Sequence, residues 1–299
     1  MSNPFEIIEP TCISFSGGRT SAFMLYKVLE AHQMSLPNEA KVIFANTGKE
    51  EEATLKFVDE CSKRWNVPIS WLEYIEVDGE HSFKQVDYQT ASRNGEPFEQ
   101  IIKHFDNALP NGRARYCSAN LKTRTFHRYL RSIGWKEWES FIGIRADEPK
   151  RVVKFRANPN PEGGHETVFL PLAQDNISSK DVSDFWKQQD FDLGLPNING
   201  KTMHGNCDLC MLKPKAQILS LIQEKPERAL WWKNKKKKHS KDALAMGNSL
   251  PLTDQLMHKC TNTLQNKLTC LIKTRKQFHV FAETKGLSLF KTFQNRNNI

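Results

Sequence analysis

The chain has 299 residues, of which 38% are hydrophobic, and its formal net charge is +9. This length allows one large domain or two small ones, and the apolar content suffices for a core. No run of 18 apolar residues occurs, and the first residues lack the basic-then-apolar pattern of a secretion signal. We therefore expect a cytoplasmic protein with no membrane span. Seven cysteines in a chain this long do not indicate a disulfide scaffold and favour a reducing compartment.

The positive charge is concentrated at the end of the chain. Residues 1–232 hold 29 Lys and Arg against 31 Asp and Glu, whereas residues 233–299 hold 14 against 3. A basic tail can bind nucleic acid, although blocks of like charge usually stay loose in solvent. The composition changes abruptly at the lysine run 235–238. We expect a domain over 1–232 and a basic tail over 233–299 that is either disordered or the product of a reading-frame slip.

Strand-like and helix-like segments alternate through the first half of the chain. Runs rich in β-branched and aromatic residues occupy 12–15, 41–45, 69–75 and 141–144, and segments with helical apolar spacing occupy 22–29, 50–65, 97–109 and 118–133. This alternation predicts an α/β fold with a Rossmann-like, doubly wound parallel sheet and helices on both faces.

A small-residue loop joins the first predicted strand to the first predicted helix. It consists of Ser16, Gly17, Gly18, Arg19, Thr20 and Ser21. Paired glycines allow a tight turn close to a ligand, and a helix N-terminus presents N–H groups to phosphate. The Walker pattern is absent. The loop is either a phosphate site of another kind or an ordinary strand-to-helix turn.

A second polar segment, formed by Asn46, Thr47 and Gly48, follows the second predicted strand. In open α/β sheets, ligands bind beyond the carboxyl ends of the strands. Both segments lie at such ends, which favours the phosphate interpretation.

The part from 150 to 232 bears a cysteine pair and shows no linker that would separate it from the first part. Ser178 has the character of a helix N-cap, residues 194–205 form a loop, and Pro226 breaks a helical segment over 215–232. The domain prediction therefore keeps 150–232 within 1–232, as a cysteine-containing extension of the sheet domain.

Cys207 and Cys210 form a Cys-x-x-Cys pair, with His204 just before it. Such a pair ligates a metal or cluster, acts as a dithiol, or carries no ligand at all. A metal site needs more ligands, and Cys117 is the best third candidate because its basic surroundings favour a thiolate. His204 is the fourth candidate.

Several segments in order resemble the phosphoadenosine phosphosulfate (PAPS) reductase family, within the wider PP-loop ATP pyrophosphatase, or adenine nucleotide alpha hydrolase-like, group. The resemblance runs from about 11 to 232. It rests on the segments 14–21, 44–48, 116–122, 143–148 with Arg151, 171–172, 207–210 and 231–232. The two late cysteines and the final tryptophan pair are similar to the subgroup that phages and mobile elements often carry.

The resemblance implies an adenine nucleotide, ATP or PAPS, bound by the loop at 16–21 and flanked by the segment at 46–48. It implies that Arg145 pairs with a phosphate or sulfate and that Lys122 and Arg151 bind anions. It implies sulfur or cluster chemistry at Cys117, Cys207 and Cys210, and the expected catalytic residues are Cys117 and Arg145. It also implies a [4Fe–4S] cluster on Cys117, Cys207 and Cys210, with zinc as the rival and His204 as a further ligand.

The sequence departs from the family pattern at three places. Thr20 and Asn46 stand where aspartates are usual, which bears on any magnesium role, and the carboxyl-terminal segment that carries the family's nucleophilic cysteine is absent. The resemblance therefore implies reduction or sulfur transfer, including transfer to nucleic acid, without selecting one. The alternative is a non-catalytic nucleotide-sensing or nucleic-acid-associated module with a structural zinc site.

Overall fold

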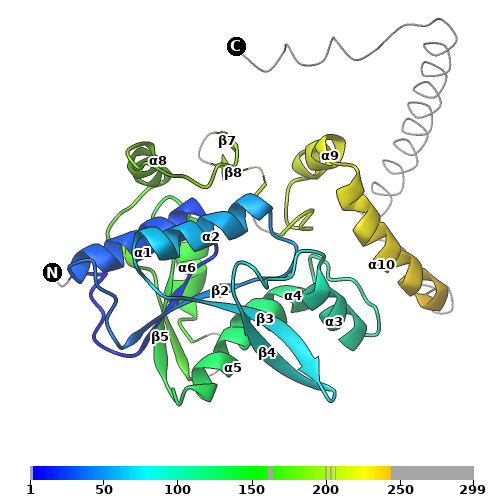
Figure 1. The fold of residues 1–299 in the computed structure, drawn as a ribbon, viewed down its shortest axis with the longest axis horizontal. Coiled ribbons are helices and arrows are strands. Elements are labelled where there is room, and N and C mark those ends of the chain that lie inside the picture. Colours follow the sequence, from blue (N-terminus) through cyan, green and yellow to red (C-terminus); the bar gives the residue numbers. More distant parts are fainter. Residues whose placement is uncertain (1–2, 161–163, 199–200, 203, 206, 244–299) are drawn as a thin grey trace, which may run out of the picture. The chain divides into compact units, whose positions relative to one another are not determined.

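The computed structural model describes residues 3–160, 164–198, 201–202, 204–205 and 207–243 (Figure 1). The chain divides into two compact units, Met1–Lys213 and Pro214–Ile299. The elements of the first unit are β1 (Thr11–Ser14), α1 (Arg19–Ala31), β2 (Ala40–Ala45), α2 (Glu52–Arg64), β3 (Ile69–Val77), β4 (Glu80–Val86), α3 (Glu96–His104), α4 (Tyr116–Ser118), η1 (Ala119–Thr123), α5 (Arg124–Ser132), β5 (Trp138–Ile142), α6 (Pro149–Ala157), β6 (Glu166–Phe169), α7 (Pro171–Gln174), α8 (Ser179–Lys187), β7 (Asn197–Ile198) and β8 (Lys201–Thr202).

A six-stranded sheet in the order β4-β3-β2-β1-β5-β6 forms the centre of the first unit. All neighbouring strands are parallel except β3 and β4, which pair antiparallel. The α/β fold class is thus confirmed, but the sheet is mixed and not purely parallel. The reason is local: Asp78 and Gly79 both have positive φ, the conformation of a two-residue hairpin turn, so the chain returns directly as an edge strand.

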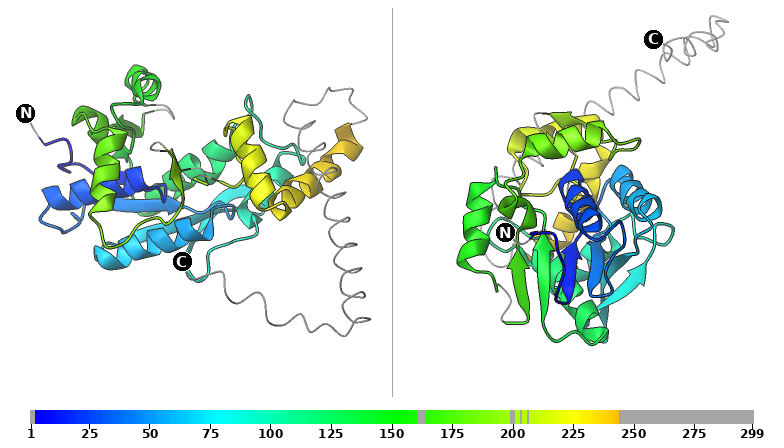
Figure 2. Two further views of the ribbon diagram at one scale, coloured as in Figure 1. Left: turned by 90° about the horizontal axis from the view of Figure 1, so that it is seen from above. Right: turned by 90° about the vertical axis from the view of Figure 1, so that its left-hand side faces the viewer.

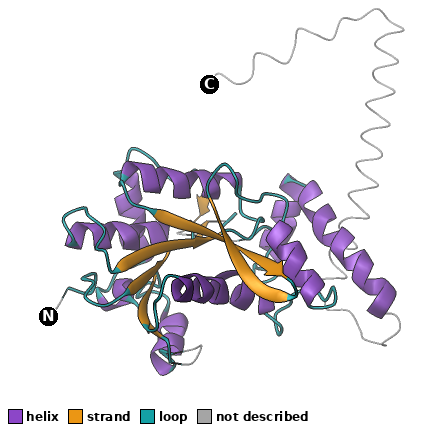
Figure 3. Cartoon of the chain, turned by 60° about the horizontal axis from the view of Figure 1, so that its bottom comes forward, coloured by secondary structure: helices purple, strands orange, loops and turns teal. Residues whose placement is uncertain are grey.

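Helices cover both faces of this sheet, as expected for a doubly wound fold (Figures 2 and 3). Because side chains alternate along a strand, neighbouring residues of β1 and β2 enter different cores. Ile13 and Val42 belong to the core that also contains buried residues of α1 and α2. Cys12 and Ile43 pack with Tyr129 and other residues on the α5 side. The sheet is therefore buried on both faces, and polar side chains gather at its ends.

Helix α8 begins at the predicted cap. The Ser178 hydroxyl accepts from the amide of Asp181, whose carboxylate accepts from the amide of Ser178, which completes a capping box. Trp186 of this helix is buried, and its indole N–H donates to the carbonyl of Arg19 at 2.9 Å. Helix α8 is thereby fastened to the start of α1.

The second unit is described from 214 to 243. It contains α9 (Lys215–Glu224) and α10 (Glu227–Ala243), with Pro226 at the predicted break between them. Helix α10 continues through the lysine run 235–238. For the rest of the tail we expected disorder or a reading-frame slip. Residues 244–299, to which this expectation applies, lie outside the described residues. No helix in the described segments is long and apolar enough to cross a membrane.

Candidate nucleotide-binding site

The glycine loop lies at the carboxyl end of β1, and its tight turn requires Gly17. The φ of Gly17 is +74°, and a Cβ there would lie 2.6 Å from Cγ2 of Thr54 and 3.2 Å from atoms of Phe44 and Val58. A side chain would therefore be strained twice, by the left-handed backbone and by the contact with α2. The loop is held tightly against the helix that follows β2.

Hydrogen bonds within the loop fix its shape before any ligand binds. The amide of Ser16 donates to Oγ of Ser21 at 3.1 Å, the two serine hydroxyls lie 2.9 Å apart, and Oγ of Ser21 also donates to the carbonyl of Gly18 at 3.0 Å. Gly18 is the N-cap of α1 and offers no side-chain acceptor to the first-turn amides. The N-terminus of α1 therefore keeps the donors and the partial positive charge that suit an anion.

The end of β5 forms the second wall of the site. A Cβ on Gly143 would lie 3.3 Å from Cα of Ser21, so the two chain segments touch through backbone. Beyond it, Nη1 of Arg145 donates to Oγ1 of Thr20 at 3.1 Å, while Nε donates to Oδ1 of Asp147 at 2.8 Å. Strands β1 and β5 are neighbours where the strand order reverses, the usual ligand position in this fold.

The turn after β2 forms the third wall. Asn46, Thr47 and Gly48 are all buried. The φ of Gly48 is +73°, and a Cβ there would lie 3.0 Å from the backbone of Gly95, so the turn packs closely against the segment before α3. The amide and the hydroxyl of Thr47 both donate to the carboxylate of Glu50, at 2.9 Å. Three predicted segments thus converge at one edge of the sheet.

The Cys-x-x-Cys segment reaches the same edge. Sγ of Cys207 lies 3.4 Å from Oγ1 of Thr47 and 3.7 Å from Oε1 of Glu50. The amide of Asp208 donates to the carbonyl of Lys49 at 2.6 Å. This docking could not be read from spacing, because about 160 residues separate the partners in the chain.

Electrostatic interactions join the three cysteines to one lysine. Burial raises the pKa of Cys207 to about 11, against the opposing charge of Lys122. Burial and the neighbouring Cys210 raise the pKa of Cys117. Negative charge at Cys207 raises the pKa of Lys122, against its own desolvation. Lys122 lies in η1, a π-helical turn that begins two residues after Cys117, and such distortions often occur at functional sites.

The thiols nevertheless do not form a ready metal site. No group of three or more His, Cys, Asp or Glu side chains suited to hold a metal ion occurs among the residues described. The donor arrangement in that part of the chain therefore does not support a [4Fe–4S] cluster or a zinc ion, and both remain predictions from the resemblance. His204 is half-buried in the loop between β8 and Cys207.

Two of the predicted anion ligands, Arg19 and Arg151, pair with carboxylates of the protein instead. Arg19 forms a double hydrogen bond with Asp192 and also donates to the carbonyl of Leu195 at 3.0 Å. Arg151 is exposed and pairs with Glu148 at 2.6 Å. Arg19 thus holds the loop after α8 in this structure, and Arg151 lies on the surface of α6.

Sequence reasoning missed two carboxylates that organise the site, Glu50 and Glu73. Glu73 is fully buried in β3, and the available signal was the single acid within the predicted strand 69–75. Glu50 opens the acidic run 50–52 after the turn.

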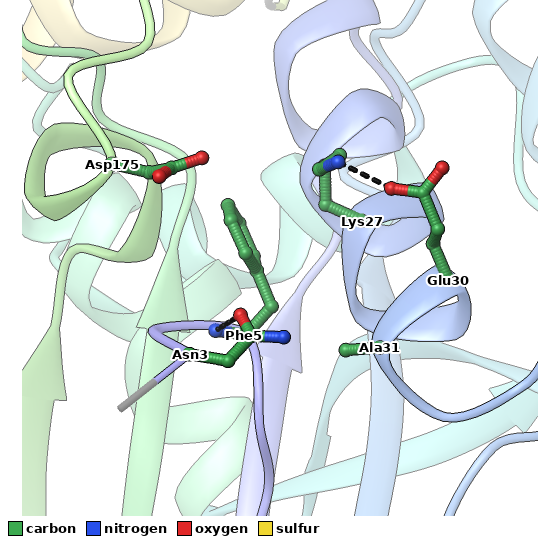
Figure 4. A pocket seen from close by; sticks show the side chains of 6 residues that line it. All are labelled: Asn3, Phe5, Lys27, Glu30, Ala31 and Asp175. Carbon is green, nitrogen blue, oxygen red and sulfur yellow. Dashed lines mark hydrogen bonds and ion pairs between the residues drawn. The ribbon is translucent and has the colours of Figure 1, made fainter. Parts of the chain in front are cut away.

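A surface cavity lies away from the loop. It is lined by Asn3, Phe5, Lys27, Glu30, Ala31 and Asp175 (Figure 4). It contains none of the predicted ligands.

The fold and the site define an α/β protein with a glycine loop at the N-terminus of a helix, at the switch point of its sheet. The sequence model of the phosphoadenosine phosphosulfate reductase domain matches residues 10–193. This match covers more than half of the chain, and the chain therefore belongs to the PAPS reductase family. Membership places it among nucleotide-binding proteins and indicates an enzyme.

The relatives are consistent with a phage-type branch of the family. An uncharacterized nin region protein of Escherichia phage lambda is 31% identical over 213 residues, which are 69% of this chain and 67% of that protein. An uncharacterized protein of Methanocaldococcus jannaschii is 27% identical over 174 residues, 58% of this chain and 31% of that protein. A crystal structure of PAPS reductase from Candida auris, in complex with phosphate, aligns with a TM-score of 0.39 at 14% identity, over 62% of this chain and 79% of that one.

Proposed function

We propose that this protein is an adenine-nucleotide-binding enzyme that carries out sulfur chemistry, either reduction or sulfur transfer. The observation that carries the proposal is the preorganised loop at 16–21 on the N-terminus of α1. Its ligand class follows from its donors, because backbone amides at a helix N-terminus suit phosphate oxygens.

The residues around the loop have separate roles in this proposal. Arg145 supplies a guanidinium next to Thr20, where it can pair with a phosphate or sulfate oxyanion. Thr47 belongs to the turn beside the nucleotide. Two of the three thiols of Cys117, Cys207 and Cys210 supply the electrons in the reductive case: they form one disulfide and release two protons, while PAPS is reduced by two electrons to sulfite and the nucleotide leaves. Lys122 stabilises the negative charge that forms on these sulfurs.

Calorimetric titration with ATP and with PAPS tests the binding step. Wild-type protein should bind at least one of the two, and Arg145→Gln should weaken binding by about tenfold or more, since a charge-assisted hydrogen bond is lost. Arg131→Gln, on the exposed end of α5, is the matched control and should leave the affinity unchanged. Equal affinities in all three proteins would remove Arg145 from the site.

Product analysis separates an enzyme from a binding module. Release of pyrophosphate or AMP from ATP, or of sulfite from PAPS with a thiol reductant, supports the enzyme. Tight binding without turnover supports the alternative, a nucleotide-sensing module, which the neutral Thr20 and Asn46 favour. A nucleic-acid acceptor for the sulfur has no support from the fold or from the relatives.

A further inference from the structure

Glu73 is a carboxylate with no exposed surface, and it lies between Leu72 and Tyr74 in the middle of β3. Its two oxygens accept four hydrogen bonds. Oε1 accepts from the amide of Ser92 at 2.6 Å and from Nδ2 of Asn46 at 2.6 Å, and Oε2 accepts from Oγ of Ser92 at 2.7 Å and from Nζ of Lys84 at 2.9 Å. A buried carboxylate is tolerated when its lone pairs are satisfied in this way.

Asn46 uses its whole side-chain amide within the turn. Nδ2 donates to Glu73 and, at 2.8 Å, to the carbonyl of Ser92, while Oδ1 accepts from the amide of Gly48 at 3.1 Å. The donors of the amide therefore face two acceptors, and its acceptor faces a donor. An aspartate at this position would place a second carboxylate against Glu73 in a buried site, where like charges repel strongly.

This pairing gives a physical reason for the departure from the family's usual aspartate. Because the oxygens of Glu73 accept, residue 46 must donate to them, and the asparagine amide does so while its own oxygen accepts from Gly48. The side chain of Asn46 is then part of the scaffold and not a ligand for magnesium.

Through these hydrogen bonds Glu73 holds the turn 46–48, which lies between the glycine loop and Cys207. Glu73 accepts hydrogen bonds from both Ser92 and Asn46. Gly48 packs against Gly95, which lies three residues after Ser92. Thr47, held between them, contacts Sγ of Cys207 at 3.4 Å. A movement of this turn would shift Thr47 relative to both the glycine loop and the cysteine.

We propose that Glu73 is a positioning residue that fixes the turn 46–48 through Asn46, and so seats Cys207 beside the nucleotide edge of the sheet. The part that concerns the nucleotide rests on the proposed function. The part that concerns Cys207 rests on the contacts alone, and the two can be measured separately.

The experiment compares wild-type protein with Asn46→Asp, Glu73→Gln and the double variant. Mass spectrometry gives the rate at which iodoacetamide alkylates Cys207 in the folded protein at neutral pH, and calorimetry gives the nucleotide affinity. Asn46→Asp should raise the alkylation rate by about tenfold and weaken nucleotide binding by a similar factor, because the buried pair becomes repulsive. In the double variant a glutamine amide faces the new carboxylate, so the alkylation rate and the nucleotide affinity should both return a large part of the way to their wild-type values.

Glu166→Gln is the matched control. Glu166 is also a buried carboxylate of this sheet, paired with His127 at 3.2 Å, but it lies at the amino end of β6, away from the site. This variant should leave both readouts at the wild-type value even if it lowers the melting temperature. Should Asn46→Asp fail to fold, Ser92→Ala removes a single hydrogen bond to Glu73 and should raise the alkylation rate by about two- to fivefold.

The proposal would be overturned if the variants of Asn46, Glu73 and Ser92 were alkylated at Cys207 as slowly as the wild type. It would also be overturned if Glu73→Gln and Glu166→Gln changed the alkylation rate equally. Additive effects of the two substitutions on these readouts in the double variant would also overturn it. Wild-type protein that binds neither ATP nor PAPS would refute the proposed function, whereas the alkylation rates would still decide the role of Glu73.

Discussion

Replacing Gly17 with alanine tests how tightly the glycine loop is packed. The substitution has two costs. A non-glycine residue in the left-handed region loses about 1–2 kcal/mol, and overpacking a tight contact costs about 1–3 kcal/mol more. The new Cβ would lie 2.6 Å from Thr54, a distance that real contacts do not reach. We therefore expect Gly17→Ala to lower the free energy of unfolding by about 2–5 kcal/mol.

Gly79→Ala provides the control. Gly79 has φ +81°, close to that of Gly17, but a Cβ there would meet nothing within 4 Å. This variant should lose only the backbone cost of about 1–2 kcal/mol. Urea unfolding at 25 °C measures both values, and their difference isolates the contact. Thr54→Ser removes Cγ2 and should reduce the cost of Gly17→Ala when the two are combined. Equal destabilisation by the two alanine variants, with no effect of Thr54→Ser, would refute the packing argument.

Two further predictions concern the neighbouring elements. Asp192→Asn should lower the free energy of unfolding by about 1 kcal/mol, because its partner Arg19 has a side chain that is only 12% exposed. Asp190→Asn, which breaks an exposed pair with Arg64, should change it by less than about 0.5 kcal/mol in the same urea assay. Equal losses in the two variants would contradict a larger contribution from the Arg19 pair. Because burial raises the pKa of Cys207 to about 11, its alkylation rate should rise as the pH increases through 11. The contribution of this protonated thiol to the free energy of unfolding should be complete below about pH 9 and should be lost as the pH rises through 11. Lys122→Met should move the alkylation midpoint to higher pH, and a midpoint near pH 9 in the wild type would show that the thiol is not buried.

The sequence predicted the elements whose chemistry is local. The glycine loop, the strand ends that carry Asn46 and Gly143, and the Ser178 cap all follow from short patterns of turn residues and apolar spacing. Strand β4 was missed because its side chains are largely polar and half-buried or exposed, so that no apolar run marks it. Its hairpin signal, Asp78-Gly79, was present in the sequence.

The connections between distant segments could not be predicted. That Arg19 pairs with Asp192, and that Cys207 contacts Thr47, depends on how loops far apart in sequence pack at one edge of the sheet. The buried Glu73 was hidden for a similar reason, since its partners come from three separate segments. Residue types alone indicate which groups can bind an anion or a thiol, whereas their partners depend on tertiary structure.

A crystal structure of the protein with bound ATP or PAPS tests the proposed nucleotide site most directly. We expect phosphate density at the N-terminus of α1, within hydrogen-bond distance of the amides of residues 17–21 and of the Arg145 guanidinium. Phosphates bound elsewhere, for example at the cavity beside Lys27, with the loop at 16–21 unoccupied, would contradict it.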